Sequence, residues 1–312
     1  MKVALCFIIS YEHILNKEEL WKTWIEPNKD IINVYFYYKD INKIKSKWIM
    51  NHTIPPDYIH ETSYFHVIPA YLSILNFAVK HDAHNQWFCL LTDSCCPIIS
   101  PRRFRYMFFN YYNKTIMSWK RAWWNVSYHK RANLQNLPTE LHLGNDSWFV
   151  MKRENVLQTM YFVKTQQSIV KTICDGGLAN ESLFAIVMCV CKQLESNGSV
   201  ISAVTHLTDW NRMSSFTSPH VFKHANNADI KFIDTELDKN KYAFFIRKIA
   251  PEFPDDTLRN YIYVKNKQRD DALVIVMPPL FIYLKIKYYL YYFGLYGLPL
   301  LLGLYVAYYF TQ

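Results

Sequence analysis

The pattern of apolar and polar positions in the first hundred residues predicts buried strands alternating with a helix. The run VALCFIIS at residues 3–10 is almost continuously apolar, which is typical of a parallel strand buried on both faces. A helix is predicted from about Lys17 to Trp24, and a second strand at Ile32–Tyr38. A third apolar run, residues 87–98, contains a strand that ends at Asp93. This order suits the first half of a nucleotide-binding α/β fold, although no G-x-G-x-x-G motif indicates a dinucleotide cofactor.

A glycine-containing turn precedes an apolar helix pattern between residues 174 and 191. Residues Asp175–Gly177 allow the chain to bend, and Asn180 is a good N-cap residue. Apolar residues then recur at helical spacing, at Leu183, Phe184, Val187, Met188 and Cys191. The pattern puts Glu181 in the first helical turn, where the helix dipole favours the ionised carboxylate that can accept a proton from a hydroxyl. The alternative is that Glu181 only caps the helix.

The C-terminal residues 271–312 predict a membrane segment. Tyr288–Phe310 is an uncharged run of 23 residues, long enough to cross about 30 Å of hydrocarbon as a helix. Lys285 and Lys287 precede this run, so the rest of the chain is expected to face the cytoplasm. The start of the chain has no signal-like leader, which predicts a single-pass protein with a C-terminal anchor. The competing interpretation is an apolar tail packed on a domain of residues 1–270.

Composition and charge narrow the class of protein. With 312 residues, of which 51% are hydrophobic, the chain can bury one substantial core. A formal net charge of +9 suits an anionic ligand, phospholipid headgroups or nucleic acid. The basic residues are scattered and no nucleic-acid module appears, so we expect no nucleic-acid partner. Seven cysteines without a C-x-x-C pair favour neither a zinc site nor a disulfide framework.

Several short segments, taken in order, resemble the core-2/I-branching glycosyltransferase family, the β-1,6-N-acetylglucosaminyltransferases and their relatives, over roughly residues 2–252. The segments are KVALCFIIS, WFCLLTDSCCPI, LGNDSWFVMKREN, the turn at Glu181, THLTDW, SPHVF and FFIRK. The resemblance implies a GT-A-like, Rossmann-type nucleotide-sugar domain with a mixed central sheet. It also implies an inverting reaction that needs no metal or other cofactor. Low glycine with abundant Tyr, Ile, Asn and Lys resembles viral members of the family.

The resemblance assigns a catalytic base and the cations that bind the leaving diphosphate. Glu181 matches the family's catalytic base, and Lys248 matches its diphosphate-binding lysine, with Arg247 adjacent. Lys223 is the candidate for a second cation after the SPHVF segment. Lysine and arginine in a site that excludes water can stabilise the charge of a leaving diphosphate without a metal ion. The alternative for all three cations is a solvated basic surface.

The ends of the first strands are where the nucleotide is expected. Ser10 and Tyr11 follow the first strand, and Lys39 and Asp40 follow the second. Asp93 is expected to face the donor sugar or ribose, with a turn role as the alternative. It is followed by Ser-Cys-Cys and not by a second carboxylate, so it would make a poor divalent-cation site. No metal site is therefore predicted.

Aromatic and basic residues are the candidates for acceptor recognition, because sugars present apolar faces beside fixed hydroxyls. By resemblance Trp148 and Trp210 hold sugars, and Lys120 and Arg121 come from the cation- and aromatic-rich stretch 118–131. Such a stretch could also bind nucleic acid, and some of the tryptophans could simply fill the core. The predicted reaction moves N-acetylglucosamine from UDP to a hydroxyl of an acceptor glycan or glycoprotein. The first alternative is an inactive membrane-anchored glycan-binding or scaffold protein. The second, less favoured, is a nucleic-acid-binding membrane protein.

Overall fold

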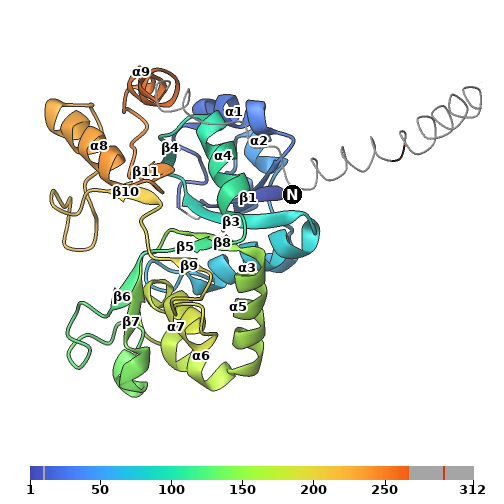
Figure 1. Ribbon diagram of the computed structural model, residues 1–312, viewed down its shortest axis with the longest axis vertical. Coiled ribbons are helices and arrows are strands. Elements are labelled where there is room, and N and C mark those ends of the chain that lie inside the picture. Colours follow the sequence, from blue (N-terminus) through green and yellow to red (C-terminus); the bar gives the residue numbers. More distant parts are fainter. Residues whose placement is uncertain (10, 267–290, 292–312) are drawn as a thin grey trace, which may run out of the picture. The chain divides into compact units, whose positions relative to one another are not determined.

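A mixed sheet at the centre of the fold carries the strands predicted from the start of the sequence. The computed structural model describes residues 1–9, 11–266 and 291, and in these residues six strands pair in the order β2-β1-β3-β8-β5-β9 (Figure 1). Their bounds are β1 (Lys2–Ile8), β2 (Ile32–Tyr37), β3 (Asn85–Thr92), β5 (Thr115–Ile116), β8 (Val150–Lys152) and β9 (Val200–Ile201). β1 runs parallel to both β2 and β3, whereas β8 is antiparallel to β3. The predicted α/β class with a mixed central sheet is confirmed, and the arrangement is compatible with a GT-A-like domain.

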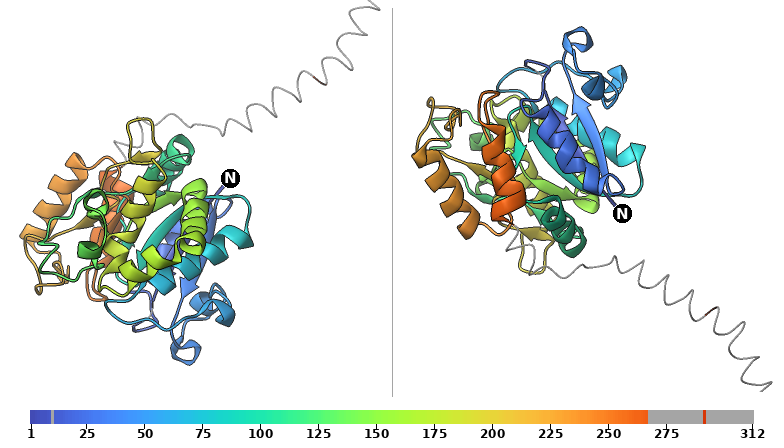
Figure 2. Two further views of the ribbon diagram at one scale, coloured as in Figure 1. Left: turned by 90° about the horizontal axis from the view of Figure 1, so that it is seen from below. Right: turned by 90° about the horizontal axis from the view of Figure 1, so that it is seen from above.

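Helices cover both faces of this sheet, as the two views in Figure 2 show. Alternate residues of β1 enter two separate cores: Val3, Leu5 and Phe7 pack with α1 (Glu18–Ile25) and α4 (Pro101–Tyr111). The intervening Ala4, Cys6 and Ile8 pack with α3 (Ile68–His81), α5 (Arg153–Thr165) and α7 (Leu183–Val190). A strand buried on both faces needs apolar residues at every position, which is why the continuous run was a reliable signal. The predicted first helix and second strand are confirmed to within a residue or two.

Two smaller sheets lie beside the central one. β10 (His206–Thr208), β11 (Phe245–Arg247) and β4 (Cys96–Pro97) form one, and β6 (Trp119–Arg121) pairs with β7 (Leu143–Asn145) in the other (Figure 1). The remaining helices are α2 (Lys47–Met50), α6 (Gln167–Cys174), α8 (Asn227–Lys239), α9 (Asp255–Arg259) and a π-helix (Asn260–Lys265). Short 3₁₀ helices occur at Glu26–Asn28, Ile41–Lys43, Pro56–Tyr58, Leu134–Asn136, Thr139–Leu141 and Ala179–Glu181.

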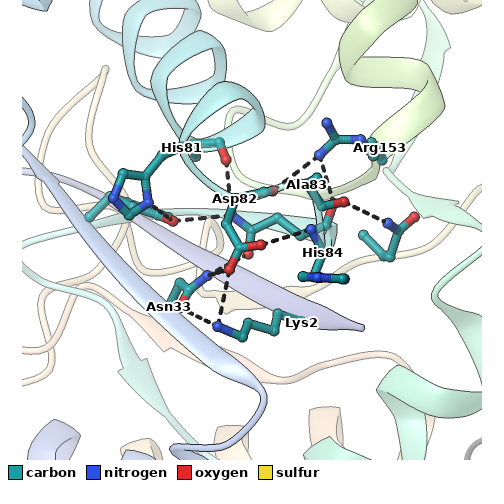
Figure 3. A network of polar contacts seen from close by, with 11 residues as sticks. Lys2, Asn33, His81, Asp82, Ala83, His84 and Arg153 are labelled. Carbon is teal, nitrogen blue, oxygen red and sulfur yellow. Dashed lines mark hydrogen bonds and ion pairs between the residues drawn. The ribbon is translucent and has the colours of Figure 1, made fainter.

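A polar network fixes the amino-terminal ends of the parallel strands (Figure 3). The Asp82 carboxylate, just after α3, accepts hydrogen bonds from Asn33 and from the His84 amide and pairs with Lys2 at 3.0 Å. Burial would raise the pKa of Asp82, but these donors outweigh it and hold that pKa well below its usual range. Arg153 donates to the carbonyls of Val79, Asp82 and Asn85. This end of the sheet is therefore occupied by structural contacts.

The predicted membrane segment, with its span at 288–310, lies outside the described residues except for Tyr291, and its anchor role stays a prediction. Within the described residues no helix combines the length and apolar character that a membrane crossing requires.

Candidate active site

Glu181 lies in a tight turn between α6 and α7. The turn is entered through Leu178, whose φ of 59° is left-handed, and continues as the 3₁₀ helix Ala179–Glu181. α7 then begins at Leu183. The predicted N-cap role of Asn180 is wrong, and so is the predicted place of Glu181 in the first α-helical turn. The physical reason is a competing network: Asn180 is buried, its carbonyl accepts from Asn145 at 2.9 Å and its side chain donates to Ser147 at 3.1 Å.

Neither glycine of this turn has a positive φ, so the turn needs no left-handed glycine, and Gly176 serves close packing. A Cβ at Gly176 would lie 2.4 Å from the Asn133 nitrogen and 2.7 Å from the Ala132 carbonyl carbon. At Gly177 the nearest atom would be 3.6 Å away, on Phe65. The amide of Ala132 also donates to the Gly177 carbonyl at 2.9 Å. The turn that carries Glu181 is thus packed directly against residues 131–133.

The Glu181 carboxylate has a different partner on each oxygen. Nη2 of Arg131 donates to Oε2 in an ion pair, and the Ser147 hydroxyl donates to Oε1 at 3.2 Å. The Glu181 side chain keeps 17% of its surface exposed. A carboxylate that is oriented from both sides and still reached by solvent is suited to accept a proton from a bound hydroxyl.

Arg247 and Lys248 come from the end of β11. Arg247 is 9% exposed, and its guanidinium carbon lies 5.0 Å from the centre of the Trp148 ring. Lys248 donates to the Ser218 hydroxyl at 2.7 Å, and burial together with the charge of Arg247 lowers its pKa. The next residue, Ile249, donates to the Ser94 carbonyl and accepts from Asn16, which places this strand end beside the end of β3.

Asp146 and Tyr71 connect the carboxylate side of the site with the cation side. Burial and the charge of Glu181 raise the pKa of Asp146 to about 6, against the opposing effects of a hydrogen bond with Ser118 and the charges of Lys120 and Arg247. Burial also raises the pKa of Tyr71; the charge of Glu181 acts in the same direction, and the charge of Arg247 acts in the opposite one. The Tyr71 ring packs on Trp148 with centroids 5.5 Å apart. The Tyr71 hydroxyl donates to the Ser147 carbonyl at 2.9 Å, so contacts through Ser147, Tyr71 and Trp148 join Glu181 and Arg247 in one cluster.

The expected nucleotide side adjoins this cluster. Asp93 follows β3 directly, and burial raises its pKa although Arg247 and Lys248 act in the opposite direction. Tyr11 is 61% exposed, and its pKa is raised by burial, by Tyr64 and by Asp93. Ser10 lies outside the described residues.

Lys39 and Asp40 are held by a histidine that the sequence did not single out. Their backbone amides donate to Nε2 of His13 at 3.2 and 2.9 Å, and His13 is almost fully buried. The Lys39 side chain donates to the Thr62 carbonyl, and the Asp40 carboxylate accepts from the Asn42 amide. His13 thus joins the loops after β1 and β2, leaving the side chains of residues 39 and 40 engaged in local contacts.

The remaining predicted residues lie further out. Lys120 lies over the Trp123 ring at 4.7 Å and acts on Asp146, so it reaches the cluster. Arg121 donates to the Thr139 carbonyl, Trp210 is half exposed and Lys223 is exposed. Among the described residues, we find no interaction that joins these last three to Glu181 or Arg247.

Arg131, Ser147, Tyr71 and Tyr64 also lie at this site and were not predicted from the sequence. The alternating basic and aromatic residues of 118–131 indicated a binding region that includes Arg131. They did not indicate which of its basic residues would reach the carboxylate. In the described ranges 1–9 and 11–266, no group of three or more His, Cys, Asp or Glu side chains is arranged to hold a metal ion.

Comparison with known protein families identifies the family of this chain. The family model described as Core-2/I-Branching enzyme matches residues 7–235. The chain belongs to this family. The resemblance found in the sequence is confirmed, and the chain is a member of a glycosyltransferase family, which implies a nucleotide-sugar donor and a glycan acceptor. The matched region contains Tyr11, Asp93, Trp148 and Glu181, and it ends before Arg247. A search of curated proteins found no match.

We expect Asp146 to make stability depend on pH. Its raised pKa, about 6, means that between the ordinary Asp pKa and this value the folded protein holds a proton that the unfolded chain has released. Stability therefore falls as pH rises through this window. Asp146→Asn cannot show this loss. The urea midpoint of the variant should therefore rise relative to that of wild type as the pH increases from about 4 to about 7. A difference that stays constant with pH would contradict the assignment.

The adjacent glycines offer a matched test of the turn. Gly176→Ala should lower the free energy of unfolding by about 1–3 kcal/mol, because the new methyl group meets backbone that cannot move aside easily. Gly177→Ala should cause no such loss, since its methyl group makes only ordinary contact with Phe65. Urea unfolding of both variants measures the difference, and equal effects would show that the packing against residues 131–133 is not the constraint.

Proposed function

We propose that this family member is a metal-independent, inverting glycosyltransferase that moves N-acetylglucosamine from UDP to a hydroxyl of an acceptor glycan. The observation that carries the proposal is that one cluster contains both the Glu181 carboxylate and the buried Arg247 guanidinium. Arg247 is nine-tenths buried, and its buried Nε has no hydrogen-bond partner in the described residues. A buried guanidinium with a free donor, next to Lys248, favours an anionic ligand such as a diphosphate.

Glu181 is the proposed base. The acceptor hydroxyl gives its proton to the carboxylate while its oxygen bonds to the anomeric carbon of the donor. The bond between that carbon and the diphosphate oxygen breaks, and its electron pair leaves with the diphosphate. Attack from the face opposite the leaving group inverts the anomeric configuration, so a single base is sufficient. Ser147 contributes by orienting Oε1 of Glu181.

Arg247 and Lys248 are the proposed stabilisers of the leaving diphosphate. The hydrogen bond from Lys248 to Ser218 can be exchanged for one to a phosphate oxygen, which is a stronger, charge-assisted acceptor. Because Arg247 lies against Trp148 and away from bulk water, its charge is poorly screened. These cations do the work that a bound metal ion performs in other glycosyl transfers.

The acceptor is proposed to lie on the aromatic side of the cluster. Trp123 is 48% exposed and carries Lys120 on its face, while Trp148 is less exposed and contacts Arg247. An exposed ring beside a cation offers both an apolar face and a hydrogen-bond donor to a sugar. Trp210, also half exposed, is retained as a second candidate for sugar contact.

The central test is Glu181→Gln, assayed first with a panel of nucleotide sugars by measuring the nucleotide released in the presence of acceptor glycans. Loss of the base should lower kcat by about 10²–10⁴-fold, while UDP binding measured by calorimetry should stay unchanged. Asp175→Asn, an exposed carboxylate in the same segment, is the matched control and should keep wild-type turnover.

Two outcomes would overturn the proposal. Full turnover in Glu181→Gln would remove the base from the mechanism. A wild-type protein that binds glycans but turns over no donor would favour the rival function of an inactive glycan-binding or scaffold protein.

Metal independence has its own test. Turnover should survive dialysis against EDTA, because the charge of the leaving diphosphate is met by Arg247 and Lys248. The control is the same protein with Mg²⁺ or Mn²⁺ restored, which should be no faster. Complete loss of turnover on chelation, with recovery on adding the metal, would make Asp93 a metal ligand and contradict the proposal.

A further inference from the structure

Arg131 is the one partner of Glu181 that comes from the loop between β6 and β7. Its backbone bridges to Gly177, and its guanidinium donates to Oε2 of Glu181. The guanidinium carbon also lies 4.5 Å from the Trp124 ring centre and 5.8 Å from that of Trp123. Arg131 therefore reaches the carboxylate from a shelf of two indole rings.

The shelf is built by close packing at Gly144 in β7. A Cβ at this position would lie 2.5 Å from the Trp123 ring and 3.0 Å from the Trp124 ring. The two rings meet edge to face with centroids 4.8 Å apart, which fixes their relative orientation. Arg131 is consequently held by contacts with the two rings and by the Gly177 bridge, and its Nη2 donates to Glu181.

The bonding of Arg131 differs from that of a structural arginine. Arg153 donates to three backbone carbonyls and ties α3, β3 and α5 together (Figure 3). The hydrogen bond that Arg131 makes is with Glu181, and in the described residues its buried Nε has no partner. An arginine that stabilised the loop alone would be expected to use its donors on the loop backbone.

We propose that Arg131 is a positioning residue for Glu181, resting on the function proposed above. By occupying Oε2 it leaves Oε1, the oxygen near Ser147, to receive the proton of the acceptor hydroxyl. The planar guanidinium on its aromatic shelf fixes both the distance and the rotation of the carboxylate, which a flexible lysine could not do. The contribution is to the chemical step and not to donor binding.

The experiment compares Arg131→Ala, Arg131→Lys and wild type in the transfer assay. Losing the orientation of the base should lower kcat by about 10²-fold in Arg131→Ala, with the donor KM unchanged. Guanidinium or ethylguanidinium ions should restore part of that kcat, because they can occupy the shelf. Arg131→Lys should be intermediate and should not respond to guanidinium. Wild-type kcat in Arg131→Ala, or no restoration by guanidinium, would overturn the proposal.

A matched control is available on α4. Arg105 pairs with Asp30 at 2.8 Å and lies 5.4 Å from the Phe109 ring centre, so Arg105→Ala removes the same two kinds of contact far from β7. It should keep wild-type kcat. If Arg131→Ala does not fold, Arg131→Lys and Trp124→Phe carry the test, each with a lowered kcat and an unchanged donor KM.

A double variant separates this inference from the proposed function. If Arg131 acts through Glu181, adding Arg131→Ala to Glu181→Gln should lower kcat little further, because the two losses are not additive. Independent, multiplying losses would show that Arg131 acts elsewhere. Failure of the function itself would appear earlier, as wild-type turnover in Glu181→Gln.

Discussion

The burial of Arg247 is the constraint on which the candidate site depends. Arg247 is 9% exposed and lies on Trp148. Because a guanidinium does not lose its proton, its positive charge shifts the pKa values of the groups around it. It lowers the pKa of Lys248 and opposes the burial that raises the pKa values of Asp93 and Asp146. A protein gains nothing in stability from an unpaired buried cation. The arrangement makes sense if an anion completes it.

The fold supplies that cation from one structural unit and the carboxylate from another. β11 is held in its own small sheet and reaches β3 through the contacts of Ile249 with Ser94 and Asn16. Glu181 is held by the network of Asn145, Asn180 and Ser147. The opposite charges are thus held by separate parts of the fold, and no ion pair between Glu181 and Arg247 forms among the described residues.

The sequence predicted those parts of the molecule that local patterns determine. β1 and α1 followed from continuous and periodic apolar residues, and the order of short segments was sufficient to identify the family. The setting of Glu181 was not predictable, because Asn180 bonds to residues more than thirty positions away instead of capping α7. Arg131 and His13 were missed for the same reason: each acts on a partner that only the tertiary fold brings close.

The two carboxyl groups beside the proposed acceptor position have different surroundings, and this difference supports different roles for them. Glu181 has an arginine on one oxygen and a hydroxyl on the other, whereas Asp146 is partly desolvated and has a pKa of about 6. Bringing a negatively charged diphosphate to Arg247 would weaken the cation that now lowers the pKa of Asp146. Asp146 would then hold its proton more firmly, while Glu181 keeps Arg131 as a counter-charge. This contrast favours Glu181, the carboxylate with its own cation, as the base in the proposed mechanism.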